Sequence, residues 1–456
     1  MGIRIGIVGA GSESFGSVTI RDVCLSDALN ETDVELVLMD IVAEHLPARE
    51  KYAHYVAERL GRAVHITATA NLDEALSGAN YVVTAIEVDR YLHWSQDFHI
   101  PRQYGFMQVY GENGGPGGLF LALRNMGPML HIARRMEALC PEAILLNFTN
   151  PESKLCQAIN MLTKVKTFGL CHGFAMGRNQ IASFLQMPVE ELETSACGMN
   201  HFTWFQTVRS RVTGDDLYPA LREKERRADP LAQWDEMALS RICLRTFGLW
   251  PSPGANHIGE YVRWAQEFLA SSALQYYYDP ADGHPWQTGN NPRFVYSLAG
   301  RPTEVPMFQK EAPKTAVPEY EEPKDEADLR PSAELAVPIM EAISCGALRE
   351  LGAVIVPNQR VIPGLDDDTV VEVPAVADRN GVRPRKMEPL PEAITALLRL
   401  QGSIQKLLVE AYAERSRRKL LQALLLDPTV HSYRNAVALI NDMCELQKDI
   451  LPTMRW

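Results

Sequence analysis

The first twelve residues constrain the fold of this chain more than any other segment. A short apolar run typical of a β-strand, residues 4–8, ends abruptly at Gly9 and Gly11. The first strand of a Rossmann fold meets its helix in this way, because one glycine permits the tight turn and the other lets the backbone approach a pyrophosphate. The third glycine of the usual fingerprint is replaced by Ser14. These residues predict a dinucleotide-binding domain, and the alternative is an ordinary strand–turn–helix unit.

A second apolar run carries an acid at its tip. Residues 34–39 are typical of a strand and are followed by Asp40. An acid at the end of the second Rossmann strand accepts hydrogen bonds from the ribose diol of the dinucleotide. Asp40 therefore favours NAD over NADP, and the alternative is an acid that only happens to follow a strand.

Length, charge and cysteine usage narrow the class of protein. A chain of 456 residues with 46% hydrophobic residues suggests two or three domains with a sizeable core. The net charge of −12 argues against a nucleic-acid partner. No signal peptide is evident, and no apolar run approaches the roughly 18 residues of a membrane span. Eight cysteines without paired spacing indicate reduced thiols. We therefore expect a cytoplasmic protein with no membrane partner.

Strand-like and helical segments alternate through the first half of the chain. The strand-like runs after the first two are residues 64–68, 78–85, 143–148 and 166–171, and a long amphipathic helix covers residues 120–139. This alternation predicts a parallel, doubly wound sheet. Because ligands of such folds lie beyond the carboxyl ends of the strands, the polar clusters at those ends form the predicted site. These clusters are residues 87–90, 147–151 and 171–172.

The second half of the chain has a different pattern. We expect helices near residues 230–248 and 390–425, a strand at 368–374, and a loop in the Pro- and Glu-rich stretch 303–331. The predicted organisation is an N-terminal Rossmann domain over residues 1–195. An α+β domain over residues 196–456 would carry the substrate, metal and oligomerisation functions.

Two residues suit a transition metal. Cys171 ends a predicted strand, and His201 follows thirty residues later. A thiolate and an imidazole form a soft site for a divalent metal. The alternative is a buried cysteine and a histidine whose hydrogen bonds are satisfied.

Two further segments need an explanation. Residues 110–118 contain five glycines, which predicts a loop rather than a helix, either in a cleft or as a flexible linker. His257, Glu260 and Tyr261 have the i, i+3, i+4 spacing of one helix face. That face either belongs to the site or begins an ordinary surface helix.

Taken together, these segments resemble glycoside hydrolase family 4, the NAD-dependent glycosidases. The matching pieces occur in the family's order: GAGS at 9–12, IPRQYG at 100–105, the glycine-rich 111–118, NFTNP at 147–151, CHGF at 171–174, GMNH at 198–201, and 368–374 with DRNG at 378–381. The resemblance implies a fold like that of lactate and malate dehydrogenases, and a homodimer or homotetramer.

The resemblance also implies an unusual mechanism, an exception among glycosidases. NAD+ takes hydride from C3 of the sugar, which acidifies the C2 proton. A base removes that proton, the aglycone leaves C1, water adds, and the hydride returns. Such a route needs a bound dinucleotide, a Lewis acid on the C2 and C3 oxygens, and a base near C2.

Site residues follow from the same resemblance. Cys171 and His201 would hold the metal, usually Mn²⁺. Tyr261 is the first candidate for the base and His257 the second, and His172 is a further candidate for catalysis and sugar binding. Glu112 would line the sugar site. The predicted cofactor-binding residues are Gly9, Gly11, Ser12, Phe15, Asp40 and Asn150, of which Asn150 would also touch the sugar.

The sugar class is inferred from two motifs. Family members that act on 6-phosphosugars typically carry Asn or Asp where His172 stands, so a phosphosugar is disfavoured. The motif WSQDF at 94–98 resembles members that accept uronic acids. We therefore expect an anionic C6 group, such as a uronate or a sulfonate, and a neutral α-galactoside or α-glucoside is the alternative. The candidate pocket residues are Arg90, His93, Trp94 and Arg293.

Two other classes of protein share the Rossmann start. One is a 2-hydroxy-acid dehydrogenase, whose usual His–Asp pair and substrate arginine are not evident. The other is a non-catalytic nucleotide-sensing module, which would have no use for the glycine-rich segment together with Cys171 and His201.

Overall fold

The structure is a computed structural model that describes residues 2–12, 15–227, 237–268, 274–277, 293–298, 301–302 and 329–456. Its N-terminal half is built on parallel strands in the order β3-β2-β1-β4-β5-β6. Their bounds are β1 Ile3–Val8, β2 Val34–Met39, β3 Val64–Thr69, β4 Tyr81–Thr84, β5 Ile144–Asn147 and β6 Lys166–Gly169. This is the Rossmann strand order, and it confirms the predicted α/β fold class.

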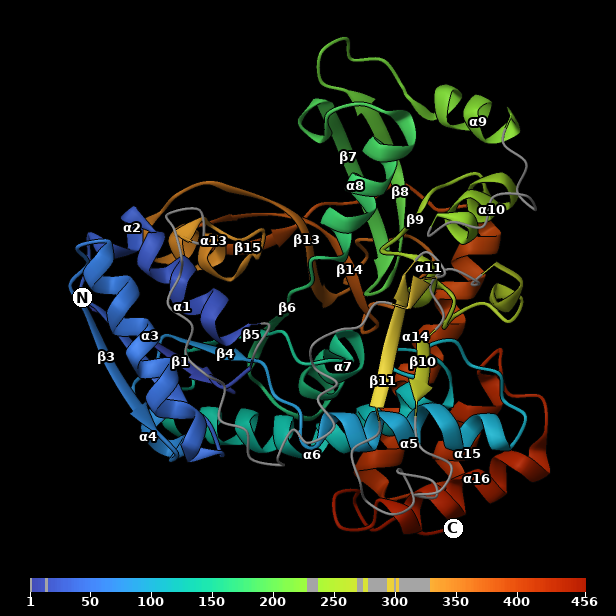
Figure 1. The fold of residues 1–456 in the computed structure, drawn as a ribbon, viewed down its shortest axis with the longest axis horizontal. Coiled ribbons are helices and arrows are strands. Elements are labelled where there is room, and N and C mark those ends of the chain that lie inside the picture. Colours follow the sequence, from blue (N-terminus) through green and yellow to red (C-terminus); the bar gives the residue numbers. More distant parts are fainter. Residues whose placement is uncertain are drawn as a thin grey trace.

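Helices cover both faces of this parallel sheet (Figure 1). The helices of this half of the chain are α1 Gly16–Leu25, α2 Asp27–Asn30, α3 Leu46–Arg59, α4 Leu72–Leu76, α5 Arg90–Gln103, α6 Gly115–Leu139, α7 Glu152–Leu162 and α8 Gly173–Leu185. Among them α5 packs on α6, and α8 packs on the antiparallel strands that continue the sheet. Alternate strand residues face opposite sides. Ile5 and Leu36 therefore join the core beneath α1 and α3, whereas Val37 and Leu145 join the core with α4 and α6. Burial on both faces explains why these strands are continuous apolar runs.

The sheet continues beyond β6 with antiparallel strands in the order β13-β14-β7-β8-β9, and β15 pairs with β14. The bounds are β7 Leu192–Met199, β8 Phe202–Ser210, β9 Pro251–Ser252, β13 Arg349–Pro357, β14 Val370–Asp378 and β15 Gly381–Pro384. Strand β14 confirms the strand expected near 368–374. Strand β7 spans the proposed division between residues 195 and 196, so both halves share one sheet, and the division itself stays a prediction.

Helices of the second half lie around this extension and beside α6 (Figure 1). They are α9 Tyr218–Arg227, α10 Ala238–Phe247, α11 Ala255–Ile258, α13 Ala336–Met340, α14 Glu392–Glu414, α15 Arg417–Leu426 and α16 Tyr433–Leu446. A small antiparallel sheet comprises β10 Leu274–Tyr277, β11 Arg293–Leu298 and β12 Arg301–Pro302. Short helical turns are η1 Ala43–His45, η2 Val189–Glu191, η3 Ala265–Phe268 and the π-turn η7 Glu341–Cys345.

The expected loop through the glycine-rich segment is wrong in its second half. Helix α6 already begins at Gly115, with Pro116 in its first turn, where proline favours helix starts. A Cβ on Gly117 would lie 2.5 Å from the backbone oxygen of Asp97, and one on Gly118 would lie 2.7 Å from Asn113. These glycines therefore permit close packing of the start of α6 against α5 and the preceding loop, which outweighs their poor helix propensity.

Other boundaries differ in smaller ways. The helix expected over 390–425 is two helices, because Arg415 has a φ of +56° and Ser416 caps α15. The helix expected near 230–248 is α10, and residues 228–236 lie outside the described residues. The expected loop at 303–331 lies outside them as far as residue 328. Among the residues described, no helix has the length and apolarity that a membrane crossing requires.

Candidate active site

The predicted polar clusters lie together at the carboxyl edge of β4, β5 and β6. These strands are neighbours, and each cluster follows one of them. The hydroxyl of Thr84 donates to Asn147 over 3.0 Å, and the amide of Ile86 donates to the hydroxyl of Thr149 over 3.0 Å. These bonds fix the loops after β4 and β5 against each other, at the edge where ligands of such sheets bind.

The turn between β1 and α1, where a dinucleotide is predicted to bind, has the backbone geometry expected from the sequence. Gly9 has a φ of +87°, and a Cβ there would lie 2.2 Å from the backbone oxygen of Ala85, so only glycine fits. The backbone amides of Gly9 and Ala10 donate to the carbonyl of Met39 at the tip of β2. Helix α1 then starts without a side-chain cap, which leaves its N-terminal amides available to an anion.

Asp40 holds the turn beside this helix start. Its carboxylate is buried and accepts hydrogen bonds from the amides of Gly11 over 2.8 Å and Val42 over 2.9 Å. Each carboxylate oxygen has a second acceptor position, so a ribose hydroxyl could still donate to Asp40. Its position fits the predicted role.

The remaining predicted cofactor residues line the same edge. The Phe15 ring stacks on Phe148, which follows β5, with ring centroids 4.7 Å apart. The Ser12 hydroxyl accepts from the amide of Phe15 over 3.3 Å. The side-chain oxygen of Asn150 is buried and accepts no hydrogen bond. These placements agree with a dinucleotide site, and the individual roles stay predictions.

Cys171 and His201 lie side by side. Cys171 follows β6, and His201 lies in the turn between β7 and β8 with a φ of +61°. The Sγ of Cys171 is 3.3 Å from Nε2 of His201, and the amide of Gly173 donates to the same sulfur over 3.3 Å. Two residues thirty positions apart thus form one soft donor pair, as predicted from the sequence.

A carboxylate that sequence reasoning missed joins this pair. Glu152 is the first residue of α7, and its carboxylate, the Cys171 sulfur and a His201 nitrogen all lie within 4.8 Å of one another. Glu152 directly follows the predicted 147–151 cluster. An acid on a helix start at the ligand edge of the sheet was the signal that could have identified it.

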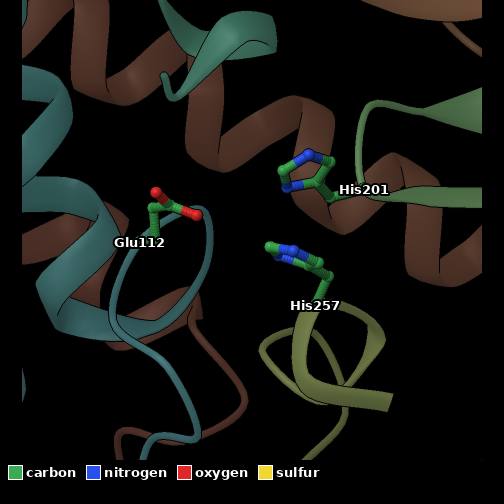
Figure 2. Close-up of side chains that lie close together, drawn as sticks. All are labelled: Glu112, His201 and His257. Atoms are coloured by element: carbon green, nitrogen blue, oxygen red, sulfur yellow. The ribbon is translucent and has the colours of Figure 1, made fainter. Parts of the chain in front are cut away.

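A second group lies on the other side of His201. Figure 2 shows Glu112 on the loop before α6 and the rings of His201 and His257 turned toward one another. The ring centroids of the two histidines are 4.1 Å apart, and the ligand atoms of all three residues lie within 4.8 Å of one another. The structure therefore places Glu112 and His257 beside His201, and their predicted roles at the sugar and as a base stay predictions.

His257, Glu260 and Tyr261 do not form one face of a helix, so that prediction is wrong. Helix α11 ends at Ile258, and the chain turns through the next residues. Glu260 is fully buried and accepts from the amides of Glu112 and Asn113 at 2.7–3.1 Å. The Glu260 carboxylate thus holds the glycine-rich loop, and it lies 3.9 Å from Nδ1 of His257.

Tyr261, the first candidate for the base, is already engaged. Its hydroxyl donates to the backbone oxygen of Asn200 over 3.3 Å, and its ring stacks on Phe202. Burial raises the pKa of Tyr261 well above its usual range, and the negative charge of Glu260 raises it further. The hydroxyl of Tyr261 therefore lies next to the site but is held by the backbone.

Burial is the main cause of the pKa shifts among the residues around Cys171 and His201. It raises the pKa of Cys171 and of Glu152 well above their usual ranges, and it raises the pKa of Glu372 to about 7. It lowers the pKa of His201, and the neighbouring rings of His257 and His172 lower it further. A neutral imidazole is the form that binds a metal, and a bound dication would reverse the shifts of the acids.

Several buried polar atoms near these residues accept or donate no hydrogen bond. They are Asn150 Oδ1, Glu152 Oε2, Asn200 Oδ1, His201 Nδ1 and His257 Nδ1. Buried polar groups in proteins are normally satisfied, so this concentration indicates a place built for a ligand. A thiolate, an imidazole and a carboxylate are donors that a divalent transition metal accepts, so the residues fit the implied metal.

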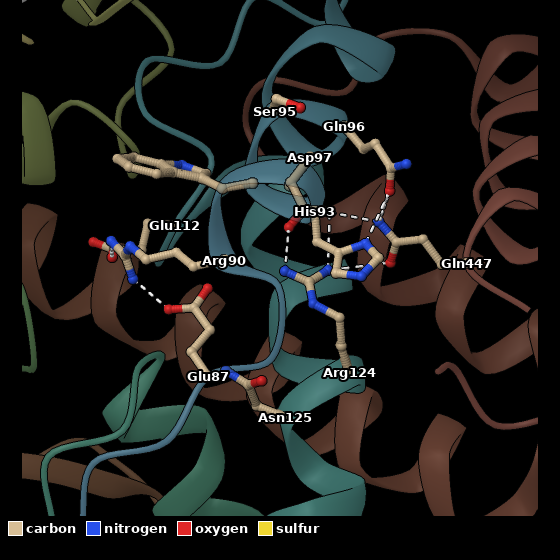
Figure 3. Close-up of polar contacts among 12 residues, drawn as sticks. Glu87, Arg90, His93, Ser95, Gln96, Asp97, Glu112, Arg124, Asn125 and Gln447 are labelled. Carbon is tan, nitrogen blue, oxygen red and sulfur yellow. Dashed lines mark hydrogen bonds and ion pairs between the residues drawn. The ribbon is translucent and has the colours of Figure 1, made fainter. Parts of the chain in front are cut away.

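The predicted sugar pocket is largely occupied by its own contacts (Figure 3). Arg90 forms ion pairs with Glu87 and, over 2.8 Å, with Glu112. Its guanidinium lies 4.7 Å over the buried ring of Trp94. His93 is buried against Gln96, and burial together with the charge of Arg124 lowers its pKa.

His172 and Arg293 are the remaining predicted residues. His172 caps the start of α8, half-exposed, with its Nδ1 3.5 Å from a carboxylate oxygen of Glu334. Arg293 begins β11, and its side chain lies outside the described part of the structure.

Sequence comparisons identify relatives along the full length of the chain. Residues 4–187 match the description "Family 4 glycosyl hydrolase", and residues 196–430 match "Family 4 glycosyl hydrolase C-terminal domain". The chain is 31% identical to an α-glucosidase of Erwinia rhapontici, with 98% of both chains covered. It is 28% identical to an α-galactosidase of Bacillus subtilis (98% and 99% covered) and 26% identical to an α-galacturonidase of Thermoanaerobacter italicus (99% and 97% covered).

Solved structures show the same fold. A putative glucosidase of Bacillus subtilis matches with a TM-score of 0.76 at 22% identity, covering 97% of this chain and all of its own. A 6-phospho-α-glucosidase from gut microorganisms, crystallised with NAD and Mn²⁺, matches with a TM-score of 0.74 at 20% identity, and both chains are fully covered. The strand order, the donor cluster and the full-length matches lead to one conclusion: the chain belongs to glycoside hydrolase family 4 and is a glycosidase.

Proposed function

We propose that this chain is an NAD+- and Mn²⁺-dependent glycosidase that cleaves a neutral α-glucoside or α-galactoside by transient oxidation at C3. The observation that carries the proposal is the pair of donor groups that share His201, one with Cys171 and Glu152 and the other with Glu112 and His257, in a chain with an uncapped Rossmann helix start. A relative of the same fold was crystallised with NAD and Mn²⁺, which supports the same two groups here.

The two bound groups would supply the redox and Lewis-acid chemistry. When bound, NAD+ would take up and return the C3 hydride, which keeps the overall hydrolysis redox-neutral, and the metal would supply Lewis-acid chemistry at the C2 and C3 oxygens. The chain's part is to hold both groups: Asp40 at the ribose, the start of α1 at the pyrophosphate, and Cys171 with His201 at the metal.

We assign the base to His257 ahead of Tyr261. The His257 ring faces His201, its Nδ1 accepts or donates no hydrogen bond, and Glu260 lies 3.9 Å away to orient it. The Tyr261 hydroxyl instead donates to a backbone carbonyl. A base must reach the proton it removes, so His257→Gln is expected to stop proton removal from C2, while Tyr261→Phe retains it.

The contacts of the predicted sugar-pocket residues favour a neutral over an anionic sugar. Arg90 was the predicted receptor for an anionic C6 group, but two carboxylates already neutralise its charge. His93 and Trp94 are buried among other side chains. The α-glucosidase and the α-galactosidase among the relatives agree with a neutral hexose. A uronide is the second candidate, because an α-galacturonidase is also a relative.

Hydrolysis of nitrophenyl glycosides tests this assignment. The α-glucoside, α-galactoside and α-galacturonide are each assayed with and without NAD+ and Mn²⁺. We expect turnover of a neutral substrate only when both are present, with no net formation of NADH. Turnover without NAD+ would contradict the mechanism, and NADH formed in proportion to substrate would favour a dehydrogenase. A preference for the galacturonide would overturn only the choice of sugar.

The oligomeric state stays a prediction. A homodimer or homotetramer is expected by resemblance, and the mass of the protein in solution measures it directly.

A further inference from the structure

We propose that Glu152 is a third protein ligand of the divalent metal held by Cys171 and His201. The inference rests on the proposed function, because it assumes that this corner of the site binds a metal. It adds a residue that belonged to none of the motifs in the sequence.

The spacing of the donor atoms fits a shared ion. Bonds of about 2.0–2.3 Å to a first-row metal place neighbouring donor atoms about 3–4.5 Å apart. The sulfur of Cys171 and Nε2 of His201 are 3.3 Å apart. With the Glu152 carboxylate, all three donors lie within 4.8 Å of one another. One ion between them therefore needs little rearrangement.

The Glu152 carboxylate is hydrogen-bonded to the side chain of Cys171, but one of its oxygens has no partner. The side chain is 2% exposed, and its Oε2 accepts no hydrogen bond. Two basic residues close to Glu152 or Cys171 in the sequence are engaged elsewhere: Lys154 donates to the backbone oxygen of Asn113, and His172 pairs with Glu334. A buried carboxylate needs a partner charge or a metal, and a bound cation supplies it.

The charges also balance. A Cys171 thiolate, a Glu152 carboxylate and a neutral His201 together carry two negative charges, which a dication neutralises. Buried charges are tolerated when they coordinate metals. Glu372, the other buried acid nearby, already accepts from the side chain of Asn200 over 2.9 Å.

Glu112 is the competing carboxylate, because it forms its own group with His201 and His257. Both of its oxygens are engaged, one by Arg90 over 2.8 Å and the other by Asn113 over 3.2 Å. The Nε2 of His201 lies 3.3 Å from the sulfur of Cys171, which belongs to the group with Glu152. The cation therefore lies on the Glu152 side of His201, and Glu112 and His257 remain beside the sugar.

Binding of Mn²⁺ alone tests the proposal. The full-length protein is titrated with Mn²⁺ in the presence of saturating NAD+, and free Mn²⁺ is followed by its electron paramagnetic resonance signal. Glu152→Gln keeps the shape of the side chain and removes its charge, and we expect its Kd for Mn²⁺ to rise at least about tenfold, the scale seen even for outer-shell changes. Cys171→Ser and His201→Ala are expected to lose at least as much.

Glu372→Gln is the matched control, because it removes a buried negative charge from the same region without removing a proposed ligand. A much smaller change in Kd is expected for it. An equal loss in both Gln variants would mean that Glu152 acts only through its charge at a distance, which overturns the proposal. Wild-type affinity in Glu152→Gln, with loss in Cys171→Ser, would also overturn it and leave the proposed function intact. No Mn²⁺ binding by the wild-type protein would reject the proposed function as well.

Thermal unfolding separates a ligand from a structural role. If Glu152 is a ligand, Glu152→Gln unfolds at or above the wild-type temperature without metal, because a buried carboxylate with one unsatisfied oxygen is gone. It then gains less stability than wild type when Mn²⁺ is added. A lower unfolding temperature without metal, combined with an unchanged gain from Mn²⁺, would show a structural role instead.

Discussion

Asp97 and Glu152 are both buried carboxylates, but their surroundings differ completely. Asp97 on α5 is fully buried, accepts from both terminal nitrogens of Arg124 at 2.8 and 3.3 Å, and accepts from Gln447 over 3.2 Å (Figure 3). The Oε2 of Glu152 accepts nothing. The first carboxylate is satisfied within the fold and ties α5 to α6 and the residues after α16. The second has an unsatisfied oxygen beside the donor atoms of Cys171 and His201, which is why we propose that it binds a metal.

The largest expected effect is a loss of glycosidase activity when a proposed metal ligand is replaced. Cys171→Ser and His201→Ala should each lower glycosidase activity by at least about a thousandfold, because a bound metal supplies several kcal/mol of charge stabilisation. A hydroxyl is also a poor replacement for a thiolate on a transition metal. Initial rates with added Mn²⁺ and circular dichroism of the same samples check this. Full activity in both folded variants after dialysis against a chelator would remove the metal from the mechanism.

Breaking the ion pair between Asp97 and Arg124 should instead lower the stability of the fold. Arg124→Met leaves Asp97 buried without its cation, which is expected to lower the free energy of unfolding by about 3–5 kcal/mol. Adding Asp97→Asn should recover part of that loss. Urea unfolding measures both variants. If Arg124→Met were as stable as wild type, the contrast between a structural and a functional carboxylate would fail.

Removal of the Asp40 carboxylate should weaken the binding of NAD+. Asp40→Ala loses the predicted ribose hydrogen bonds to a charged group, about 1.5–3 kcal/mol of NAD+ binding. Asp40→Asn keeps an acceptor and should lose less. Because Asp40 also holds the amides of Gly11 and Val42, the unfolding temperature of each variant is the control. Unchanged NAD+ affinity in Asp40→Ala would exclude Asp40 from the cofactor site.

The smallest expected effect is a dependence of stability on pH that comes from His93, which lies near the Asp97–Arg124 ion pair. Burial and the charge of Arg124 lower the pKa of His93 from its ordinary value of 6.5. Below pH 6.5 the unfolded chain then binds a proton that the folded chain does not, so His93 lowers stability as the pH falls. We expect wild type to lose stability relative to His93→Asn between pH 7 and pH 5 in urea unfolding. A constant difference between the two proteins would show that His93 protonates freely in the fold.

The sequence predicted the parts of this molecule that depend on local pattern. Continuous apolar runs gave the parallel strands, and residue types at strand ends gave Cys171 and Asp40. Helix α6 was misjudged because the need for glycine arose from close packing against α5, a contact between segments that no local pattern records. The contribution of Glu152 was missed for a related reason: a lone acid on a helix start has meaning only when the fold brings Cys171 and His201 beside it.

Hydrolysis in D₂O tests the central claim, that the redox and metal groups act together on the sugar's C2 and C3. The wild-type protein with NAD+ and Mn²⁺ is given the neutral glycoside that it cleaves fastest, and the released sugar is examined by NMR. Removal and return of a proton at C2 predicts deuterium at that carbon in the product. A product that carries only hydrogen at C2 would contradict the mechanism.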